Sequence, residues 1–190
     1  MQTNLLWTGR EYYSLENCRV HSNENGNRIA STIIGLYTGD LYQVDYQIDT
    51  NARWETVSVA INFFKNNIFR QFHLEKNTSG NWLLDGQINE EFSGCTDVDL
   101  PLTPFTNTLP IRRLNMVIGN QYPIKVIYLD LLEDRLSAVS QLYTRLSETV
   151  FHYENVPNDF EADIIVDEDG LVADYPELFV RTARRDFSMN

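Results

Sequence analysis

Short runs of alternating apolar and polar residues recur along the chain and predict β-strands. In residues 41–48, for example, Tyr42, Val44, Tyr46 and Ile48 share one face of the predicted strand. The same pattern predicts strands at residues 56–63, 68–74, 82–88, 116–118, 124–129, 160–166 and 171–174. Turn signals separate these runs at intervals of roughly ten residues, which is typical of an antiparallel meander.

Two of the turns have sequences that favour tight hairpins. Gly119-Asn120 joins residues 116–118 to 124–129, and Asp167-Glu168-Asp169-Gly170 joins residues 160–166 to 171–174. Glycine beside Asn or Asp is common in such turns because these residues tolerate a positive φ angle. Both segments are therefore predicted to form β-hairpins.

Two other segments depart from the strand pattern. Residues 106–115 are predicted to form a short helix, with Thr108 as N-cap and Pro110 in the first turn. In residues 132–150, apolar side chains recur at helical spacing, and on this period alone the segment would be an amphipathic helix. Residues 149–154 are strand-like, however, and residues 139–144 suit either state. The residue pattern leaves the state of this segment open.

Composition is that of one ordinary globular domain, expected to span residues 1–190. The chain has 190 residues, of which 43% are hydrophobic and 22% are charged. A chain of this length buries a full core without disulfides, and its two cysteines, Cys18 and Cys95, are expected to be reduced. The N-terminus lacks the features of a signal peptide, and no apolar run reaches the ~20 residues of a membrane span. We expect a cytoplasmic protein without an integral membrane segment.

The net charge and the absence of certain motifs exclude several classes of function. Asp and Glu number 27 against 15 Lys and Arg, which gives a formal charge of −12. Such a surface repels phosphate backbones, so nucleic-acid partners are not expected. Phosphate-binding loops and a nucleophile elbow are absent from the sequence. The loop around Gly170 fails the EF-hand template, and His73 and His152 stand alone, so no metal or other cofactor is expected.

Residues 95–114 hold the densest polar constellation. Asp97 and Asp99 would share one side of a strand, and Thr106, Asn107, Arg112 and Arg113 follow closely. Three interpretations remain open. The groups could bind a sugar, the two carboxylates could perform acid–base chemistry on a glycosidic bond, or Asp–Arg pairs could neutralise a buried helix.

The segment from Pro104 to Leu114, PFTNTLPIRRL, resembles a motif of the bacterial putative glycolipid-binding family. Residues 94–100, 141–146 and 167–172 support the resemblance, as does Tyr175-Pro176. It extends, more loosely, through Trp54 and Trp82, and so covers nearly the whole chain. The resemblance implies a mainly β fold: a long antiparallel sheet curled into a spiral β-roll around a single short α-helix. It also implies a homodimer, and it favours strand over helix for residues 132–150.

We expect a binding or carrier protein, without catalysis, for a glycolipid or related amphipathic ligand. In this hypothesis the curled sheet supplies an apolar wall for acyl chains, and polar residues bind the head group. The candidate ligand-binding residues are Asp97, Asp99, Thr106, Asn107, Arg112, Arg113 and Tyr143. Two alternatives remain: a sugar-processing enzyme that uses Asp97 and Asp99, and a structural dimeric module whose partner is another protein. An anionic head group would favour the arginines, whereas a neutral sugar would favour the Asp and Asn residues.

Overall fold

Fifteen strands form one continuous sheet in the structure, a computed structural model that describes residues 1–188. The strands are β1 (Gln2–Gly9), β2 (Ser14–Asn23), β3 (Gly26–Tyr37), β4 (Asp40–Asn51), β5 (Thr56–Lys65), β6 (Ile68–Lys76), β7 (Trp82–Leu84), β8 (Gln87–Ile88), β9 (Asp97–Asp99), β10 (Gln121–Asp130), β11 (Arg135–Arg145), β12 (Val150–Val156), β13 (Glu161–Val166), β14 (Val172–Tyr175) and β15 (Phe179–Phe187). The predicted mainly β fold is confirmed.

The sheet is a meander with one long return. Its strand order is β8-β7-β6-β5-β4-β3-β2-β1-β15-β14-β13-β12-β11-β10-β9. The chain starts in the middle of the sheet, runs to one edge at β8, crosses over, and returns from the other edge to pair β15 with β1. Neighbouring strands are antiparallel except β9 and β10, which are parallel. The predicted antiparallel meander is thus confirmed, with one parallel pair at an edge.

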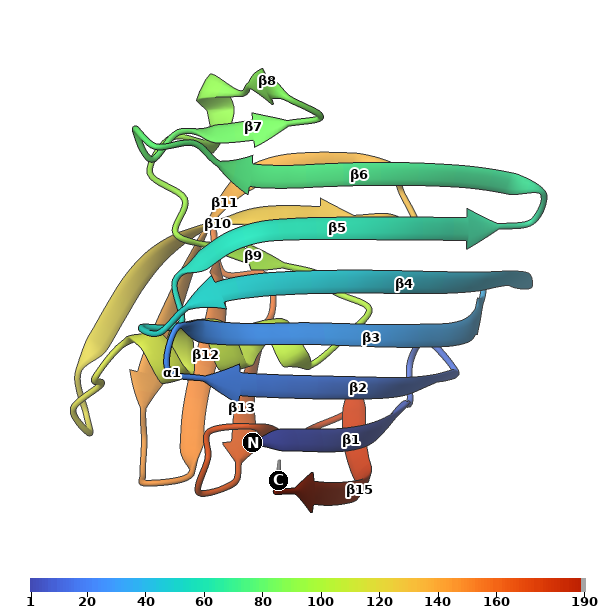
Figure 1. Cartoon of the computed structure of the whole chain (residues 1–190). Coiled ribbons are helices and arrows are strands. Elements are labelled where there is room, and N and C mark those ends of the chain that lie inside the picture. The colour runs from blue at the N-terminus through green and yellow to red at the C-terminus, as the bar shows by residue number, and fades with distance from the viewer. Residues whose placement is uncertain (189–190) are drawn as a thin grey trace.

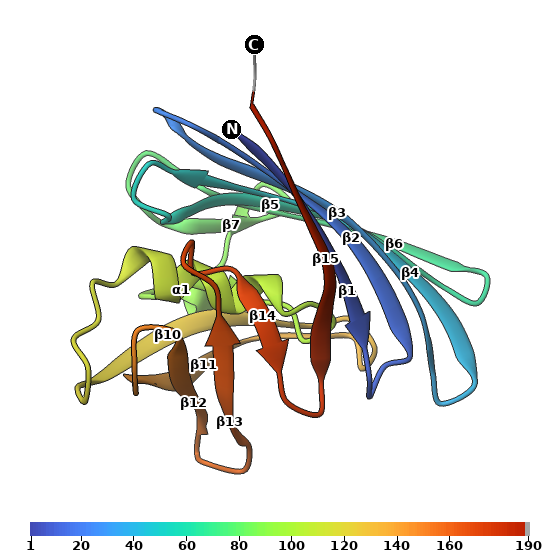
Figure 2. The ribbon, with the colours of Figure 1, turned by 90° about the horizontal axis from the view of Figure 1, so that it is seen from below.

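The sheet curls so that its two halves face each other. Strands β1–β6 form one layer, and β10–β13 form a second layer that crosses behind it (Figure 1). Seen from below, α1 (Thr108–Arg113) lies between the layers (Figure 2). It directly follows a 3-10 turn, η2 (Phe105–Asn107). A single short helical segment inside a curled sheet is the arrangement that the family resemblance implied; the other helical element in residues 1–188 is the 3-10 turn η1 (Glu90–Phe92).

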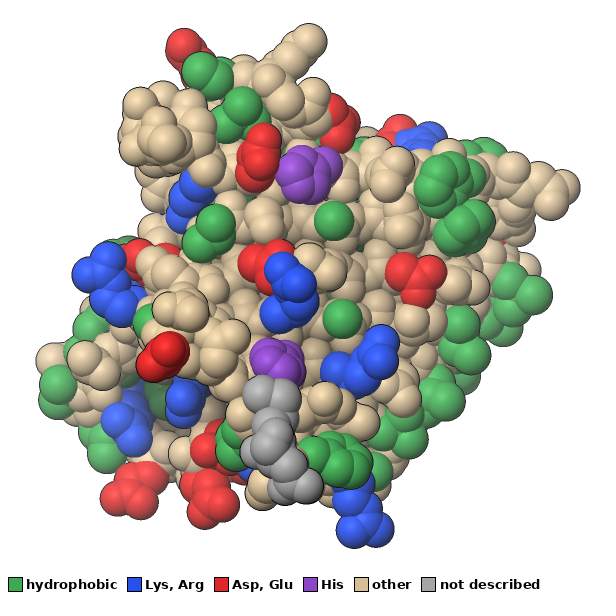
Figure 3. Space-filling view, in the orientation of Figure 1, with side chains coloured by type: hydrophobic (Ala, Val, Ile, Leu, Met, Phe, Trp, Pro, Cys, Tyr) green, Lys and Arg blue, Asp and Glu red, His purple; other side chains and the backbone are tan. Residues whose placement is uncertain are grey.

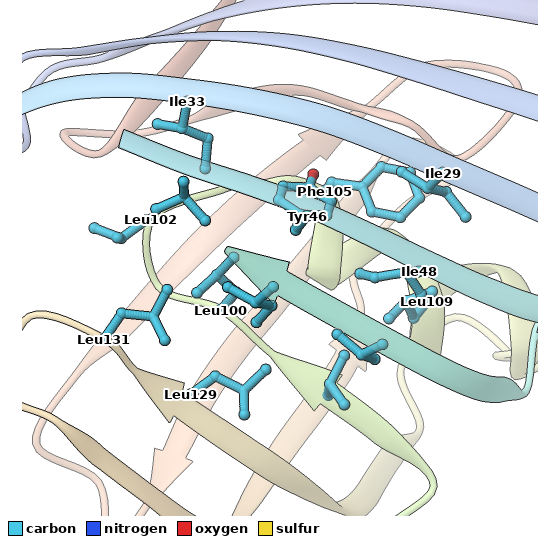
Figure 4. Packing of buried hydrophobic residues seen from close by; sticks show 14 of the residues in the cluster. Ile29, Ile33, Tyr46, Ile48, Leu100, Leu102, Phe105, Leu109, Leu129 and Leu131 are labelled. Atoms are coloured by element: carbon cyan, nitrogen blue, oxygen red, sulfur yellow. The ribbon is translucent and has the colours of Figure 1, made fainter. Parts of the chain in front are cut away.

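Apolar side chains from both layers and from the helical segment meet in the space between the layers (Figure 4). Phe105 and Leu109 project from η2 and α1 and are fully buried. Ile29 and Ile48 reach them from the first layer, and Leu129 comes from the second. Protein side chains therefore fill the inside of the curl, and the main core lies where an acyl chain was expected. Both cysteines are buried and free, as predicted.

The helix is confirmed, but its predicted cap is wrong. Thr108 is the first residue of α1 and has helical backbone angles, and Asn107 precedes it without a side-chain capping bond. The Thr108 hydroxyl is buried and has no partner within residues 1–188. Because η2 runs directly into α1, the backbone is already helical before Thr108. No extended residue is available there to act as an N-cap.

Two predicted strands are corrected. Residues 82–88 form two strands, β7 and β8, because Asp85 and Gly86 both have positive φ angles and reverse the chain. Residues 116–118 are not a strand, so the predicted hairpin through Gly119-Asn120 does not form. Strand β10 is already paired with β9 on one side and β11 on the other, so it has no free edge with which residues 116–118 could pair.

Residues 132–150 contain β11, with a turn before it and a bend after it, and end at the first residue of β12, so the family resemblance predicted this segment correctly and the helical period did not. Leu136 and Ala138 on β11 are half-buried against the main core, while Gln141 and Tyr143 are fully buried. The alternation expected for a strand is blurred because residues on both faces of its first half are half-buried. The turn at Asp167–Gly170 is confirmed and links β13 to β14.

Candidate functional site

A pocket of about 610 Å³ opens on the inner face of β10–β12 and β14, beside the turn that links β1 to β2. We call it the polar–aromatic pocket. Its aromatic lining residues are Tyr12, Tyr128, Tyr153, Phe160, Tyr175 and Phe179. Its polar and charged lining residues are Glu11, Asp99, Thr103, Asn107, Arg135, Ser137, Ser140, Gln141, Asn155 and Asp159. This size suits a small-molecule ligand, because such sites typically measure roughly 300–1,000 Å³.

Asp99 reaches the pocket from β9 and is held from two sides. Thr106 Oγ1 donates to Asp99 Oδ1 at 3.1 Å, and Gln141 Nε2 donates to Asp99 Oδ2 at 2.6 Å. Burial raises the pKa of Asp99, and the two hydrogen bonds oppose that rise. Each carboxylate oxygen retains a further lone pair, so Asp99 is an oriented acceptor for a ligand hydroxyl. The structure thus brings together three residues from β9, η2 and β11.

Asn107 lies at the pocket wall and is positioned by Tyr143. The Tyr143 hydroxyl donates to Asn107 Oδ1 at 2.8 Å, and Asn107 Nδ2 donates to the Pro104 carbonyl at 3.4 Å. Tyr143 itself is fully buried and does not line the pocket. Burial raises its pKa well above the ordinary tyrosine value. Tyr143 is therefore a neutral phenol that orients Asn107.

The aromatic wall is built by contacts between rings. Tyr153 contacts Tyr175 edge-on with ring centroids 6.5 Å apart, and Tyr12 stacks on Phe179 at 6.0 Å. Burial raises the pKa of Tyr153 and of Tyr175, and it raises the pKa of Tyr128 to about 12. These phenols stay neutral at physiological pH. They offer apolar faces for stacking and hydroxyls for hydrogen bonds.

Asp97 has a different environment from Asp99 although both lie on β9. Its side chain is fully buried and forms an ion pair with Arg113, with Nη2 2.6 Å from Oδ2 and Nε 3.3 Å from Oδ1. Burial raises the pKa of Asp97, and the bond and charge of Arg113 oppose that rise. Neither residue lines the polar–aromatic pocket. The pair neutralises a charge beside the helix, which is the structural role that the sequence left open.

Arg112 points elsewhere again. Its guanidinium lies over the Trp54 ring, 5.1 Å from the centroid, and its stem packs beside Gly170. It lines a separate small pocket of about 190 Å³ beside the β13–β14 turn. Of the seven predicted residues, Asp99 and Asn107 therefore line the large pocket, and Thr106 and Tyr143 hold them. Asp97, Arg112 and Arg113 lie outside it.

The pocket also contains residues that the sequence analysis did not select. Gln141 and Tyr153 are the central ones, and Gln141 Nε2 lies 3.2 Å from the Tyr153 hydroxyl. Gln141 could have been found, because it stands two residues before Tyr143 and so shares its face in a strand. Tyr153 had no local signal, because its contact with Gln141 depends on the register of β11 with β12, which pairs Tyr153 with Tyr143.

A buried carboxyl group lies next to the pocket floor. Glu16 Oε1 accepts hydrogen bonds from Ser31 Oγ at 2.7 Å, Tyr46 Oη at 2.7 Å and Thr103 Oγ1 at 2.9 Å. Its other oxygen, Oε2, is buried without a hydrogen-bond partner in the described part of the chain. Burial raises the pKa of Glu16 to about 7. Since Thr103 lines the pocket, this network connects the core to the pocket floor.

An apolar groove of about 840 Å³ lies at one end of the outer face of β2–β5. We call it the outer groove. The exposed apolar residues that line it are Leu15, Ile34, Leu36, Leu41 and Phe64. Figure 3 shows apolar side chains gathered along this end of the sheet, whereas polar and charged side chains cover much of the remaining face. Within residues 1–188 no helix has the length and apolar character required to span a membrane.

The chain matches the family described as "Putative glycolipid-binding" over residues 4–181. Among solved structures it is similar to the crystal structure of a DUF1089 family protein from Pseudomonas aeruginosa, with 33% sequence identity and a TM-score of 0.80. The similarity covers 88% of this chain and 91% of that one. The comparison with curated proteins finds no match.

Proposed function

Since this chain belongs to the family described as "Putative glycolipid-binding", we propose that it binds an amphipathic ligand with a sugar head group, without catalysis. The polar–aromatic pocket carries this proposal. Its wall combines tyrosine rings with carboxylate, amide and hydroxyl groups, and sugars need both kinds of contact. Hydroxyl groups take the hydrogen bonds, while the C–H faces of the sugar ring stack on aromatic side chains.

The charges at the pocket favour a neutral sugar over an anionic head group. Asp99, Glu11 and Asp159 line the pocket together with one basic residue, Arg135. Both arginines of the central motif lie outside it, where Arg113 is paired with Asp97. A phosphate or carboxylate would meet more negative than positive charge here. A neutral sugar would instead donate hydroxyl protons to Asp99.

The apolar part of the ligand must lie along the pocket wall, because protein side chains occupy the interior of the curl. Val139, Val156 and Leu178 add apolar surface to the aromatic lining of the pocket. A short alkyl segment next to the sugar fits this lining. The remainder of a long acyl chain would leave the pocket through its mouth.

Native mass spectrometry tests for a resident ligand. Protein purified gently from its expression host is measured intact, and an organic extract is then analysed for lipids. Extra mass that disappears on denaturation and proves to be a glycolipid supports the proposal.

A second experiment measures binding of a defined probe. Octyl β-glucoside, kept below its micelle concentration, is titrated into the protein in a calorimeter. Saturable binding, weakened in Asp99→Asn and unchanged in Arg112→Ala, is expected. Equal binding by both variants and the parent would contradict the proposed site.

The enzymatic alternative needs two carboxylates at one substrate, and the contacts of Asp97 do not favour it. Asp97 already binds Arg113 with both oxygens, and it lies away from the pocket that Asp99 lines. Asp97 therefore belongs to an internal ion pair, whereas Asp99 belongs to the pocket, and the two carboxylates do not meet at one site. We favour binding as the function.

We further propose that two copies of the chain associate through the outer groove and that the protein acts in the cytoplasm. Exposed apolar side chains that gather in one patch are typical of interaction surfaces, and Leu41 and Ile34 are more than half exposed there. The two free buried thiols support a reducing compartment. Sedimentation analysis of the parent and of Leu41→Glu tests the dimer: a shift of the variant to monomer is expected, whereas an unchanged dimer places the interface elsewhere.

A further inference from the structure

His152 lies among three carboxylates on the outer face of the β12–β13 hairpin. His152 and Glu154 stand two residues apart on β12, so their side chains share a face. The antiparallel register pairs His152 with Asp163 and Glu154 with Glu161 on β13. Four potential metal ligands thus form one cross-strand square. From the sequence alone His152 was interpreted as isolated, because two of its acidic neighbours, Glu161 and Asp163, come from the next strand.

The imidazole ring is oriented by Asp163. His152 Nδ1 lies 2.7 Å from Asp163 Oδ1. An ionised carboxylate can only accept, so Nδ1 carries the proton and Nε2 of the neutral ring has a free lone pair. Nε2 is the ring nitrogen that lies near the two glutamates. A carboxylate behind the imidazole is the usual support of a metal-binding histidine, because it sets both the tautomer and the ring orientation.

The distances on the Nε2 side suit a shared ion better than direct hydrogen bonds. Nε2 lies 3.5 Å from Glu154 Oε1 and 4.0 Å from Glu161 Oε2. Direct bonds to carboxylates measure roughly 2.7–2.9 Å. Two ligands that are each ~2.1 Å from one tetrahedral zinc ion lie about 3.4 Å apart. The three ligand atoms all lie within 4.8 Å of one another, so a small adjustment of the side chains brings them around one ion.

The charge of the cluster also favours a cation. Within residues 1–188, the ion pairs of Glu154, Glu161 and Asp163 are all with His152. The Asn158 amide donates to both glutamates, at 3.1 and 3.0 Å, which contributes no net charge. Three carboxylates therefore share a single histidine as their ion-pair partner.

We propose that His152, Glu154 and Glu161 form a binding site for a divalent transition metal such as Zn²⁺, with Asp163 as a positioning residue. An imidazole nitrogen combined with two carboxylates suits Zn²⁺ or Mn²⁺, whereas Ca²⁺ requires six or more oxygen ligands. The site is reachable from solvent, because the Glu161 side chain is 59% exposed. This proposal is independent of the sugar pocket and stands or falls on metal binding alone.

Calorimetric titration with Zn²⁺ tests the site. The full chain is prepared without an affinity tag, treated with a chelator and dialysed. We expect one Zn²⁺ per chain, with affinity at least 100-fold lower in His152→Ala and about 10-fold lower in Glu161→Gln. The matched control is His21→Ala on the outer face of β2, where the cross-strand neighbour is Arg28. This control should bind Zn²⁺ as the parent does.

Asp163→Asn separates positioning from ligation. It should retain one Zn²⁺ per chain and lose about 10-fold in affinity, which is typical when the support of a metal-bound histidine is changed. Circular dichroism of each variant verifies the fold. No heat with the parent chain, or equal Zn²⁺ affinity in His152→Ala and the parent, would overturn the proposal. A parent affinity for Ca²⁺ that equals its affinity for Zn²⁺ would also overturn it, because it would indicate a purely acidic surface.

Discussion

The two ends of β9 show how different the roles of two neighbouring carboxylates can be. Asp97 faces Arg113 in the core, and Asp99 faces the polar–aromatic pocket with hydrogen-bond donors on both oxygens. Burial raises the pKa of each, but a full positive charge opposes the rise only at Asp97. The residue type and the strand are the same. The partner supplied by the rest of the fold makes one group structural and leaves the other available to a ligand.

The largest expected effect comes from breaking the buried ion pair. Asp97→Asn should lower the free energy of unfolding by about 3–5 kcal/mol, because Arg113 is left buried without its counter-charge. Urea denaturation measures the loss. Asp49→Asn is the matched control, since Asp49 pairs with Arg28 at 2.7 Å on the exposed outer face and should cost less than about 1 kcal/mol. Equal losses in the two variants would contradict the structural role of Asp97.

Glu16 extends the comparison to a buried carboxyl group that has no cationic partner within residues 1–188. Its pKa is raised from 4.5 to about 7 by burial, so the folded state holds the proton more tightly than the unfolded state does. The resulting stability is full below about pH 4.5 and is lost as the pH rises through 7. Relative to Glu16→Gln, the parent should lose about 2–3 kcal/mol of unfolding free energy between pH 5 and 8.

Urea denaturation of both proteins at several pH values measures this difference, and titrations common to the two chains cancel in the comparison. A parallel pH dependence of the parent and Glu16→Gln would mean that Glu16 keeps its charge when folded. A difference that grows in favour of the parent with rising pH would contradict the sign of the predicted pKa shift.

Asp99→Asn should cost less unfolding free energy than Asp97→Asn does, and it should weaken ligand binding. Asparagine keeps one acceptor oxygen, so one of the bonds from Thr106 and Gln141 is lost at a cost of about 1–2 kcal/mol. Binding of octyl β-glucoside should fall by about 10-fold, which corresponds to roughly 1.4 kcal/mol. Urea denaturation and calorimetry measure the two effects. A stability loss as large as that of Asp97→Asn, with unchanged binding, would remove the distinction between the two ends of β9.

The smallest effect is expected at the residue that supports Asn107. Tyr143→Phe removes the hydroxyl that donates to Asn107 Oδ1 and should cost about 1 kcal/mol of unfolding free energy. It should weaken octyl β-glucoside binding by a few-fold only, because Asn107 loses orientation and not its own polar atoms. The same two measurements apply. A binding loss greater than that of Asp99→Asn would indicate that Tyr143 contacts the ligand directly.

Local pattern predicted most of the regular strands but was less reliable at their ends. Residues 41–48 lie within β4, where one long strand alternates cleanly between core and solvent. For residues 132–150 the spacing of apolar residues predicted a helix, which was wrong, because β11 is half-buried on both faces along its first half. Residues 116–118 were predicted to form a hairpin with β10, but both edges of β10 are already paired with other strands. Alternation reports burial on one face, whereas pairing depends on which edges are free.

The candidate site was predicted in part for the same reason. Asp99, Thr106 and Asn107 are close in sequence, and the structure brings them together at one wall. Tyr153 and Tyr175 complete that wall from distant strands, so no local motif could indicate them. Arg112 and Arg113 stand in the same motif but point to different surroundings, because successive residues of a helix lie about 100° apart.

By itself the sequence determined the class of fold, the short helix, and the polar constellation at residues 95–114, from which Asp99, Thr103 and Asn107 line the pocket. These features follow from alternation, turn chemistry and composition, which act over a few residues. The tertiary structure decided which carboxylate is neutralised, which tyrosines line the pocket, and that His152 meets Glu161 and Asp163. Each of these depends on the register and curl of the sheet, which bring together groups that are distant in the chain.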